Sequence, residues 1–266
     1  MMMMKTLPLF GLVAGLLSPT VVSLAHVPQE SSPNLHPQMQ ISLEFPPAPS
    51  GEGARSSAGG GTRGNDDEDK ICTTGDIPLT ALIPNEIDAE TTVSANPDLF
   101  VFVPENTAKQ GQFIMVDEDG KEVYLNTFDI PNEAGIVQVS LPETVTLEVG
   151  QTYKWQFVVL CSADNPNQVE FVEGKIKRTE LSEDLKTQIE AATEPLEQAK
   201  LYAQERIWQD TLMILAKLRE SHTTEWEQFL KSVGLDAVIA SVPLTPCCVE
   251  TEAEQEEPTP TEPDEQ

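Results

Sequence analysis

The stretch FIMVDEDGKEVYLNTF at residues 113–128 decides the fold class, because two apolar, alternating runs flank one short polar turn. The turn contains an Asp-Gly pair at 119–120, and such a pair between two strand patterns is a strong short-range signal for a β-hairpin. Further along, TYKWQFVVLC at residues 152–161 alternates in the same way, which places Tyr153 and Trp155 on one face of a strand. Both stretches therefore predict antiparallel β-structure.

Outward from these two stretches, short apolar or alternating runs recur between Pro, Gly and Asn turn signals. Seven short strands at this spacing predict an antiparallel β-sandwich of immunoglobulin-like type over residues 71–181. The runs are PLTALIP (78–84), DLFVFVP (98–104), QFIMVDE (112–118), EVYLNTFDI (122–130), GIVQVSLP (135–142), YKWQFVVLC (153–161) and VEFVEGKIKR (169–178).

After Leu181 the apolar residues recur every three to four positions, which indicates amphipathic helices. Residues 182–248 are therefore predicted to form a small helical cap on the sandwich, with Gly234 ending one of its helices. Residues 197–220 look like a tetratricopeptide-type helical hairpin, but no second copy follows at the repeat period. The predicted fold class is thus α+β, a sandwich followed by a helical cap.

The two ends of the chain differ in composition from the predicted sandwich and cap. The first 25 residues contain a lysine, a short apolar run and small residues before a cleavage site after Ala25, as in a secretory signal peptide. A retained single-pass anchor is the alternative. Residues 26–70, rich in Pro, Ser and Gly, predict a disordered linker, and residues 249–266 predict a disordered acidic tail. We therefore expect an exported protein, periplasmic or extracellular, without a membrane span after cleavage.

The formal net charge of −28, from 16 basic and 44 acidic residues, limits the partners of the chain. A nucleic-acid backbone or an anionic membrane surface would be repelled except at local basic patches. The basic patch formed by Lys175, Lys177 and Arg178 alternates along a predicted strand. We therefore expect no nucleic-acid partner, whereas cations and basic proteins stay open as partners.

Four cysteines in an exported chain predict disulfides, and four cysteines allow three pairings. The preferred pair is Cys72 with Cys161, which would clamp the chain entering the sandwich to a late strand and stabilise the fold by roughly 4 to 5 kcal/mol. The adjacent Cys247 and Cys248 could bond to each other, pair with other chains, or supply a partner for Cys161. A zinc site competes with these pairings, but the chain lacks the CxxC-type spacing and the neighbouring histidines. No metal or cofactor is therefore predicted.

The glycine-rich stretch GGGTRG at residues 59–64 could be either a phosphate cradle or a tether. A phosphate loop needs a strand before it and a helix after it, with Lys and Ser or Thr completing the site. The stretch has neither context, and the acids at 66–69 would repel an anion, so a tether is favoured. A docking role stays open, with Arg63 as the contact residue.

The sequence assembles no catalytic constellation. His222 is the only histidine of the predicted folded region, it falls in a loop between helices, and no G-x-S-x-G elbow accompanies it. The carboxylates of Glu170 and Glu173 would lie on opposite faces of one strand. The acids of DEDG at 117–120 do not continue into an EF-hand pattern, which favours a hairpin turn over a calcium loop.

A set of motifs over roughly residues 55–248 is shared with one known family: GGGTRG followed by Cys72, LTALIP, FVFVP, DEDGKEVY, IVQVSLPE, LEVGQTYKWQFVVLC, FVEGKIKR, LYAQERIWQDTL, SVGL and Cys247-Cys248. On these motifs the chain resembles the exported cyanobacterial proteins grouped as domain of unknown function 928. That family has no established activity, so the resemblance implies export and this organisation, and no catalytic residues. One position departs from the pattern: Arg206 stands where a glycine is expected before Ile207, which argues against a clean helix break.

Three classes of function are compatible with these observations. The first is a non-enzymatic protein-interaction module of the cell envelope, whose exposed sheet or helical hairpin binds another envelope or secreted protein. Trp208 and Trp226 are docking candidates for this class, although their helical spacing favours the core. The second is a carboxylate-based hydrolase of unrecognised type, and the third is a Ca²⁺- or carbohydrate-binding surface protein. We rank the interaction module first, because nothing catalytic is assembled.

Overall fold

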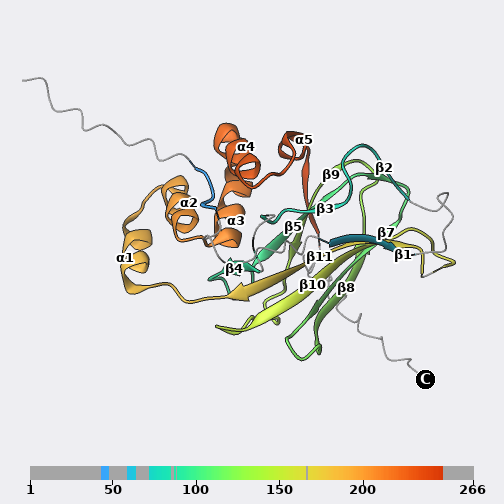
Figure 1. The fold of residues 1–266 in the computed structure, drawn as a ribbon, viewed down its shortest axis with the longest axis horizontal. Helices are drawn as coiled ribbons and strands as arrows, with labels where there is room; N and C mark the ends of the chain where they lie inside the picture. Colours follow the sequence, from blue (N-terminus) through green and yellow to red (C-terminus); the bar gives the residue numbers. More distant parts are fainter. Residues whose placement is uncertain are drawn as a thin grey trace, which may run out of the picture. The chain divides into compact units, whose positions relative to one another are not determined.

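The structure is a computed structural model that describes residues 43–47, 59–63 and 72–247, apart from 85, 86, 88 and 166. All of these residues belong to one unit, which spans residues 41–266. Within the described ranges the architecture is α+β, with strands in three sheets and helices that follow most of the strands in the chain (Figure 1). None of the helices in these ranges has the length and apolar character of a membrane span.

The alternating stretch from 152 to 160 forms the strand in the middle of the largest sheet. This sheet has the order β1-β11-β10-β7-β8, and β4 pairs with the end of β11. The predicted hairpin is confirmed: β7 pairs antiparallel with β8, and Gly120 turns the chain with a φ of +81°, which glycine adopts without steric cost. The strands of this sheet are β1 (Gly59–Arg63), β4 (Glu90–Thr92), β7 (Gln110–Val116), β8 (Glu122–Asp129), β10 (Thr152–Leu160) and β11 (Val169–Arg178).

The remaining strands form a four-stranded sheet in the order β12-β9-β5-β3 and a two-stranded sheet, β2-β6. Two pairings are parallel, β12 with β9 and β4 with β11, so the expectation of a purely antiparallel arrangement is wrong in this respect. A parallel pair needs a long connection, and all five helices of the described ranges lie between β9 and β12. The strands are β2 (Thr73–Thr74), β3 (Thr80–Ala81), β5 (Asp98–Val103), β6 (Glu105–Asn106), β9 (Gly135–Ser140) and β12 (Leu244–Cys247).

The helical pattern predicted after Leu181 corresponds to five helices in the described part of the chain. Gly234 ends one of them with a φ of +84°, and the N–H of Leu235 donates to the carbonyl of Leu230 at 3.2 Å, which satisfies a carbonyl at the helix end. The helix end predicted at Gly234 is confirmed. The helices are α1 (Glu183–Ala191), α2 (Pro195–Gln204), α3 (Trp208–Leu218), α4 (Thr223–Ser232) and α5 (Ala237–Ser241).

Neighbouring residues of a strand point to opposite faces, and this alternation divides the apolar side chains between two cores. Leu99 and Val101 of β5 join Trp155 of β10 in a core between the two larger sheets, which we call the sheet core. Phe100 and Phe102 point the other way and pack with residues of α2 to α5, in what we call the helical core. The four-stranded sheet therefore contributes to both cores.

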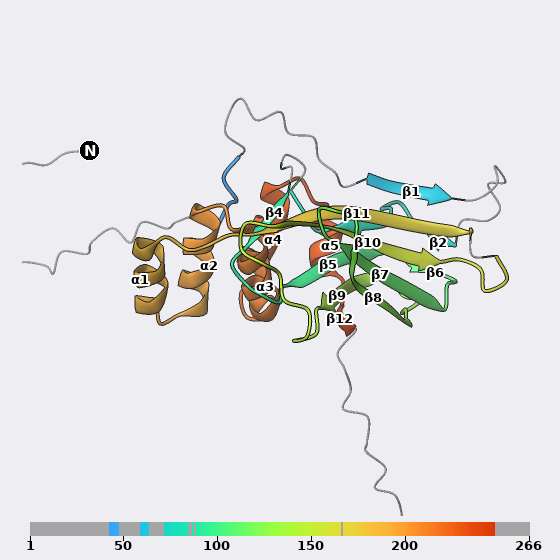
Figure 2. The ribbon, with the colours of Figure 1, turned by 90° about the horizontal axis from the view of Figure 1, so that it is seen from below.

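Two pieces of the range predicted as a linker, 26–70, belong to the folded unit. Residues 59–63 form β1, which lies beside β11 and pairs antiparallel with it (Figure 2). Main-chain pairing needs no side-chain burial, so this glycine-rich stretch forms an edge strand where a tether was expected. Residues 43–47, which we call the strap, bury Leu43 and Phe45 in the helical core, with exposed fractions of only 2% and 6%.

Candidate functional site

The strap is held in a groove on the helical side of the unit, which we call the strap groove and define by Arg206, Trp208, Phe229 and Ser232. The rings of Trp208 and Phe229 are stacked with their centroids 4.6 Å apart. Phe45 of the strap meets both rings edge-on, at 5.0 Å from Trp208 and 6.1 Å from Phe229. Edge-to-face contacts of this kind add to the free energy gained from burying the ring. The apolar part of the groove is therefore an aromatic pocket for one side chain.

Arg206, which stands where a glycine was expected, follows the end of α2 in the left-handed conformation with a φ of +60°. Its N–H donates to the carbonyl of Ala203 at 3.0 Å, and the N–H of Ile207 donates to the carbonyl of Tyr202 at 2.9 Å. These two hydrogen bonds form a Schellman motif, in which the position of Arg206 is usually a glycine. The expectation that arginine impairs the helix break is therefore wrong.

The side chain of Arg206 holds the strap through its backbone. The guanidinium Nη1 donates to the carbonyl of Pro46 at 2.7 Å and to that of Pro47, and the guanidinium carbon lies 5.5 Å from the centre of the Phe45 ring. At the other side the Ser232 hydroxyl accepts a hydrogen bond from the N–H of Phe45 at 3.0 Å. Because proline has no N–H, the groove needs few acceptors to satisfy this segment.

The groove continues into a cavity of about 430 Å³ beside the strap. Its lining combines apolar side chains with the polar side chains of Arg206, Ser232 and Glu44. Cavities that offer both kinds of group are common at binding sites. The lining residues outside the strap are Pro84, Ile87, Arg206, Ser232, Val233 and Gly234.

The two tryptophans predicted as docking candidates are core residues. Trp208 is 0% and Trp226 1% exposed, and each indole N–H donates to a buried carbonyl, that of Leu82 at 3.1 Å and that of Ala240 at 3.0 Å. This burial contradicts the docking role predicted for the two tryptophans. Trp208 takes part in the site only through the contact of its ring with Phe45. Arg63, the third docking candidate, is the last residue of β1, with its Cα opposite that of Val169.

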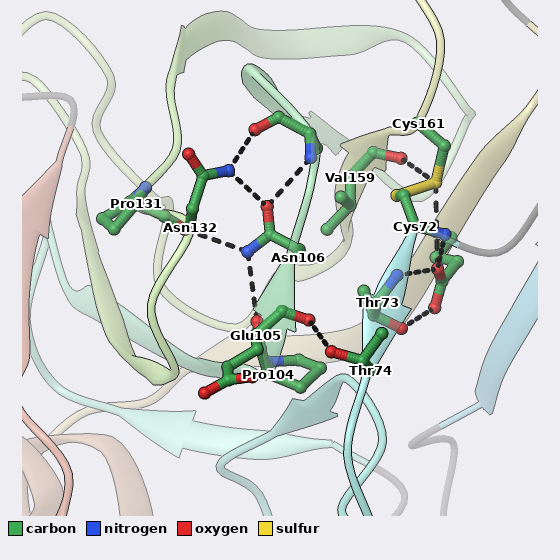
Figure 3. The surroundings of a disulfide bond; sticks show 12 residues. Cys72, Thr73, Thr74, Pro104, Glu105, Asn106, Pro131, Asn132, Val159 and Cys161 are labelled. Carbon is green, nitrogen blue, oxygen red and sulfur yellow. Dashed lines mark hydrogen bonds between the residues drawn. A yellow bond between two sulfur atoms is a disulfide. The ribbon is translucent and has the colours of Figure 1, made fainter.

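The predicted disulfide between Cys72 and Cys161 is confirmed, with the two Cα atoms 5.2 Å apart (Figure 3). It joins the residue before β2 to the residue after β10. The carboxylate of Glu170 on β11 lies against it and accepts hydrogen bonds from the N–H of Cys72 at 3.0 Å and from the N–H of Thr73 at 2.9 Å. The chain entering the sheets is therefore fixed both by a covalent bond and by a buried carboxylate.

A network of asparagines supports the strands beside this disulfide (Figure 3). The Asn106 amide donates to the carbonyls of Pro104 at 3.1 Å and Pro131 at 2.9 Å, and its oxygen accepts from the N–H of Ala108. Asn132 donates to the carbonyl of Ala108 at 2.7 Å. A network in which buried amides are satisfied on both sides fixes one loop arrangement.

The structure also places the remaining candidates. The sulfurs of Cys72 and Cys161 and a carboxylate oxygen of Glu170 lie within 4.8 Å of one another, a cluster that the spacing argument against zinc did not anticipate. Cys247 in β12 is disulfide-bonded, and no described cysteine is a free thiol. Cys248 and Ala25 lie outside the described residues.

The acids of the predicted hairpin turn, by contrast, serve the turn itself. Asp117 Oδ1 accepts from the N–H of Asp119 at 3.0 Å and from that of Lys121 at 2.8 Å.

Two buried acids were missed by sequence reasoning. Glu90 of β4 is 1% exposed; burial raises its pKa to about 8, against the opposing hydrogen bond that Trp155 Nε1 donates to it at 3.0 Å. Burial also raises the pKa of Asp210, which accepts from the Thr92 hydroxyl at 2.8 Å and the Val93 N–H at 3.0 Å. Neither carboxyl is among the residues that line the cavity beside the strap. The pattern ETT at 90–92 gives no sign that its acid is buried.

The fold and the strap groove together define an α+β protein whose helical side holds an extended segment of its own chain. The model of the family described as Domain of Unknown Function (DUF928) matches residues 58–244, and the chain belongs to this family. The match begins just before β1, so the strap lies outside it. No curated protein matches the chain.

Among solved structures, the chain is similar in part to a β-glucuronidase of Parabacteroides merdae determined with glycerol in its active site. The sequences are 15% identical and the TM-score is 0.23. The likeness covers 38% of this chain and 13% of the glucuronidase, so this chain spans only a small part of that enzyme's length.

Proposed function

We propose that this protein is an exported, non-enzymatic interaction module of the cell envelope, which docks an extended segment of a partner protein in the strap groove. The observation that carries the proposal is the seating of residues 43–47 in that groove. A short peptide from another protein can make the same contacts. They are the burial of two apolar side chains, the hydrogen bonds that Arg206 donates to two proline carbonyls, and the hydrogen bond that one main-chain N–H donates to Ser232.

The chemistry of the strap defines the partner segment. It has a buried leucine, an exposed glutamate, a buried phenylalanine and two prolines, of which the second, Pro47, is exposed. Proline-rich segments are already extended when free, so they lose little conformational entropy on binding, and aromatic-lined grooves recognise them for this reason. The partner is therefore a protein with an extended apolar–x–aromatic–Pro–Pro segment.

The wider organisation belongs to the same proposal. A signal peptide cleaved after Ala25 would deliver the chain to the periplasm or beyond, where the Cys72–Cys161 disulfide is maintained. An immunoglobulin-like sandwich and a tetratricopeptide-like pairing of α2 with α3 would both be recognition scaffolds, and these two helices do pack against each other.

A peptide competition experiment tests the groove. The probe is a synthetic peptide of residues 41–50, and the receptor is the full mature chain with Leu43→Ser and Phe45→Ser, which weaken its own strap. We expect saturable binding, seen as a change in tryptophan fluorescence because Phe45 contacts Trp208, and at least tenfold weaker binding to the wild-type chain, whose groove is filled.

The matched controls are the same peptide carrying Phe45→Ser and a receptor carrying Leu125→Ser, a change on exposed β8 that leaves the strap in place. Absence of saturable binding to the strap-weakened receptor, with its circular dichroism unchanged, would overturn the proposal. So would equal binding of the two peptides.

A further inference from the structure

The disulfide site, independent of the strap groove, carries a second inference that starts from Glu170. This carboxylate belongs to a residue that is 8% exposed, and it accepts three hydrogen bonds, from the N–H of Cys72, the N–H of Thr73 and the Thr73 hydroxyl at 2.5 Å. Its Oε1 lies 3.8 Å from the sulfur of Cys161. A buried carboxylate is thus aimed at the disulfide by donors that belong to the segment carrying Cys72.

Each cysteine is also held by hydrogen bonds that do not involve its sulfur. The carbonyl of Cys72 accepts from the N–H of Thr107 at 3.0 Å, and its N–H is bonded to Glu170. The N–H of Cys161 donates to the carbonyl of Gln168 at 2.9 Å. These bonds do not depend on the S–S bond, so we expect them to keep the two sulfurs close to each other and to the carboxylate after reduction.

We propose that reduction of the Cys72–Cys161 disulfide creates a binding site for one thiophilic divalent cation of the Zn²⁺ type, with Cys72, Cys161 and Glu170 as ligands. The step balances with a dithiol as reductant: the protein disulfide takes up two electrons and two protons, and the dithiol becomes a disulfide. Binding of the cation then releases the two thiol protons to water, because the thiolate is the ligand.

The geometry and the charge both favour this cation. Tetrahedral Zn²⁺ with bonds of about 2.3 Å to sulfur requires ligand atoms roughly 3.8 Å apart. The three ligand atoms here lie within 4.8 Å of one another, so small side-chain movements complete the arrangement. Two thiolates beside a buried carboxylate would repel one another, and a divalent cation removes that repulsion. Water takes the fourth position.

Cobalt is the probe for the test, because thiolate bound to Co²⁺ gives a charge-transfer absorption that a carboxylate alone does not. The measurement uses the full mature chain with Cys247→Ser and Cys248→Ser, so that only one disulfide can be reduced. We expect the reduced protein to bind one Co²⁺ with this absorption, Zn²⁺ to displace it, and the oxidised protein to bind at least a hundredfold more weakly.

Two variants separate a ligand from a structural role. Glu170→Gln should weaken Co²⁺ binding at least tenfold, whereas Thr73→Val removes one donor to Glu170 and no ligand, and should change the affinity less than threefold. The inference is overturned if the reduced, folded protein gives no thiolate absorption with Co²⁺, if the oxidised protein binds equally well, or if Glu170→Gln leaves the affinity unchanged while circular dichroism shows the native fold.

Discussion

The sheet core and the helical core are both closed by a chain segment from far away in the sequence, but by different means. The sheet core is closed where Cys72 is joined covalently to Cys161, 89 residues later. The helical core is closed by the strap, which only side-chain packing and a few hydrogen bonds retain. One closure is therefore covalent and is reinforced by hydrogen bonds to Glu170, whereas the other depends wholly on contacts that a competing peptide can replace.

The largest expected effect is the loss of the covalent closure. Cys72→Ser with Cys161→Ser should lower the free energy of unfolding by about 4 to 5 kcal/mol, because the unfolded chain regains the freedom of a long loop. Denaturant titration followed by circular dichroism measures this. The matched control is Cys247→Ser with Cys248→Ser, which opens no long loop. A loss below about 1 kcal/mol would mean that Glu170 alone closes the sheet core.

Phe45→Ala removes the main anchor of the noncovalent closure. We expect a loss of about 3 kcal/mol in the free energy of unfolding, the usual cost of removing a buried phenylalanine ring. Glu44→Ala, at an exposed neighbour in the same segment, should change it by less than about 0.5 kcal/mol. Equal effects of the two substitutions would show that the strap does not depend on its aromatic contact with Trp208 and Phe229.

Glu90 gives the sheet core a pH dependence. Its pKa is raised to about 8 in the folded protein from about 4.5, so between these values the folded state holds a proton that the unfolded state has released. Stability should therefore fall as the pH rises through this window, by up to about 1.4 kcal/mol per pH unit. Relative to Glu90→Gln, the wild-type protein should lose about 2 kcal/mol between pH 5.5 and 7.

Denaturant titrations of the wild-type protein and Glu90→Gln at several pH values check this. The raised pKa of Asp210 acts in the same direction, but both proteins contain Asp210, so its contribution cancels in the comparison. Parallel pH profiles of the wild-type protein and the variant would contradict the prediction.

The elements that could be predicted from the sequence are those whose signal is local and repeated. Neighbouring residues were enough to predict three of these elements: the hairpin turn at Gly120, the helix end at Gly234 and the long alternating strand β10. The Cys72–Cys161 pair was accessible because chemistry limits what a cysteine can bond to. By contrast, the strap offers two apolar residues in five, and its partners are more than 150 residues away in the chain.

Burial and edge pairing were out of reach for related reasons. The sequence does not say that β4, the strand bearing Glu90, pairs with β11 and contacts α3, so an acid there looks like a solvent-exposed residue. β1 is mainly glycine, and its pairing with β11 uses only main-chain groups that every residue has. The helical spacing of Trp208 fits both a core and a docking residue, and only the packed structure separates the two.

Arg206 supplies the smallest and most discriminating effect. A non-glycine residue at a φ of +60° costs about 1 to 2 kcal/mol, and the hydrogen bonds from the Arg206 guanidinium to the strap, here called the clip, offset this cost. Arg206→Ala keeps the backbone cost and removes these hydrogen bonds, so we expect the free energy of unfolding to fall by about 1 kcal/mol. Arg206→Gly loses the clip but also relieves the backbone, and its stability should stay within about 0.5 kcal/mol of the wild type.

Combining Arg206→Gly with Phe45→Ala tests whether Arg206 stabilises the protein through the strap. With the strap already released there is no clip to lose, so Arg206→Gly in the Phe45→Ala background should raise the free energy of unfolding by about 1 kcal/mol. Denaturant titration of the four proteins completes the double-mutant cycle. If the effect of Arg206→Gly is the same in both backgrounds, Arg206 and the strap are not coupled, and the strap is retained by Phe45 and Leu43 alone.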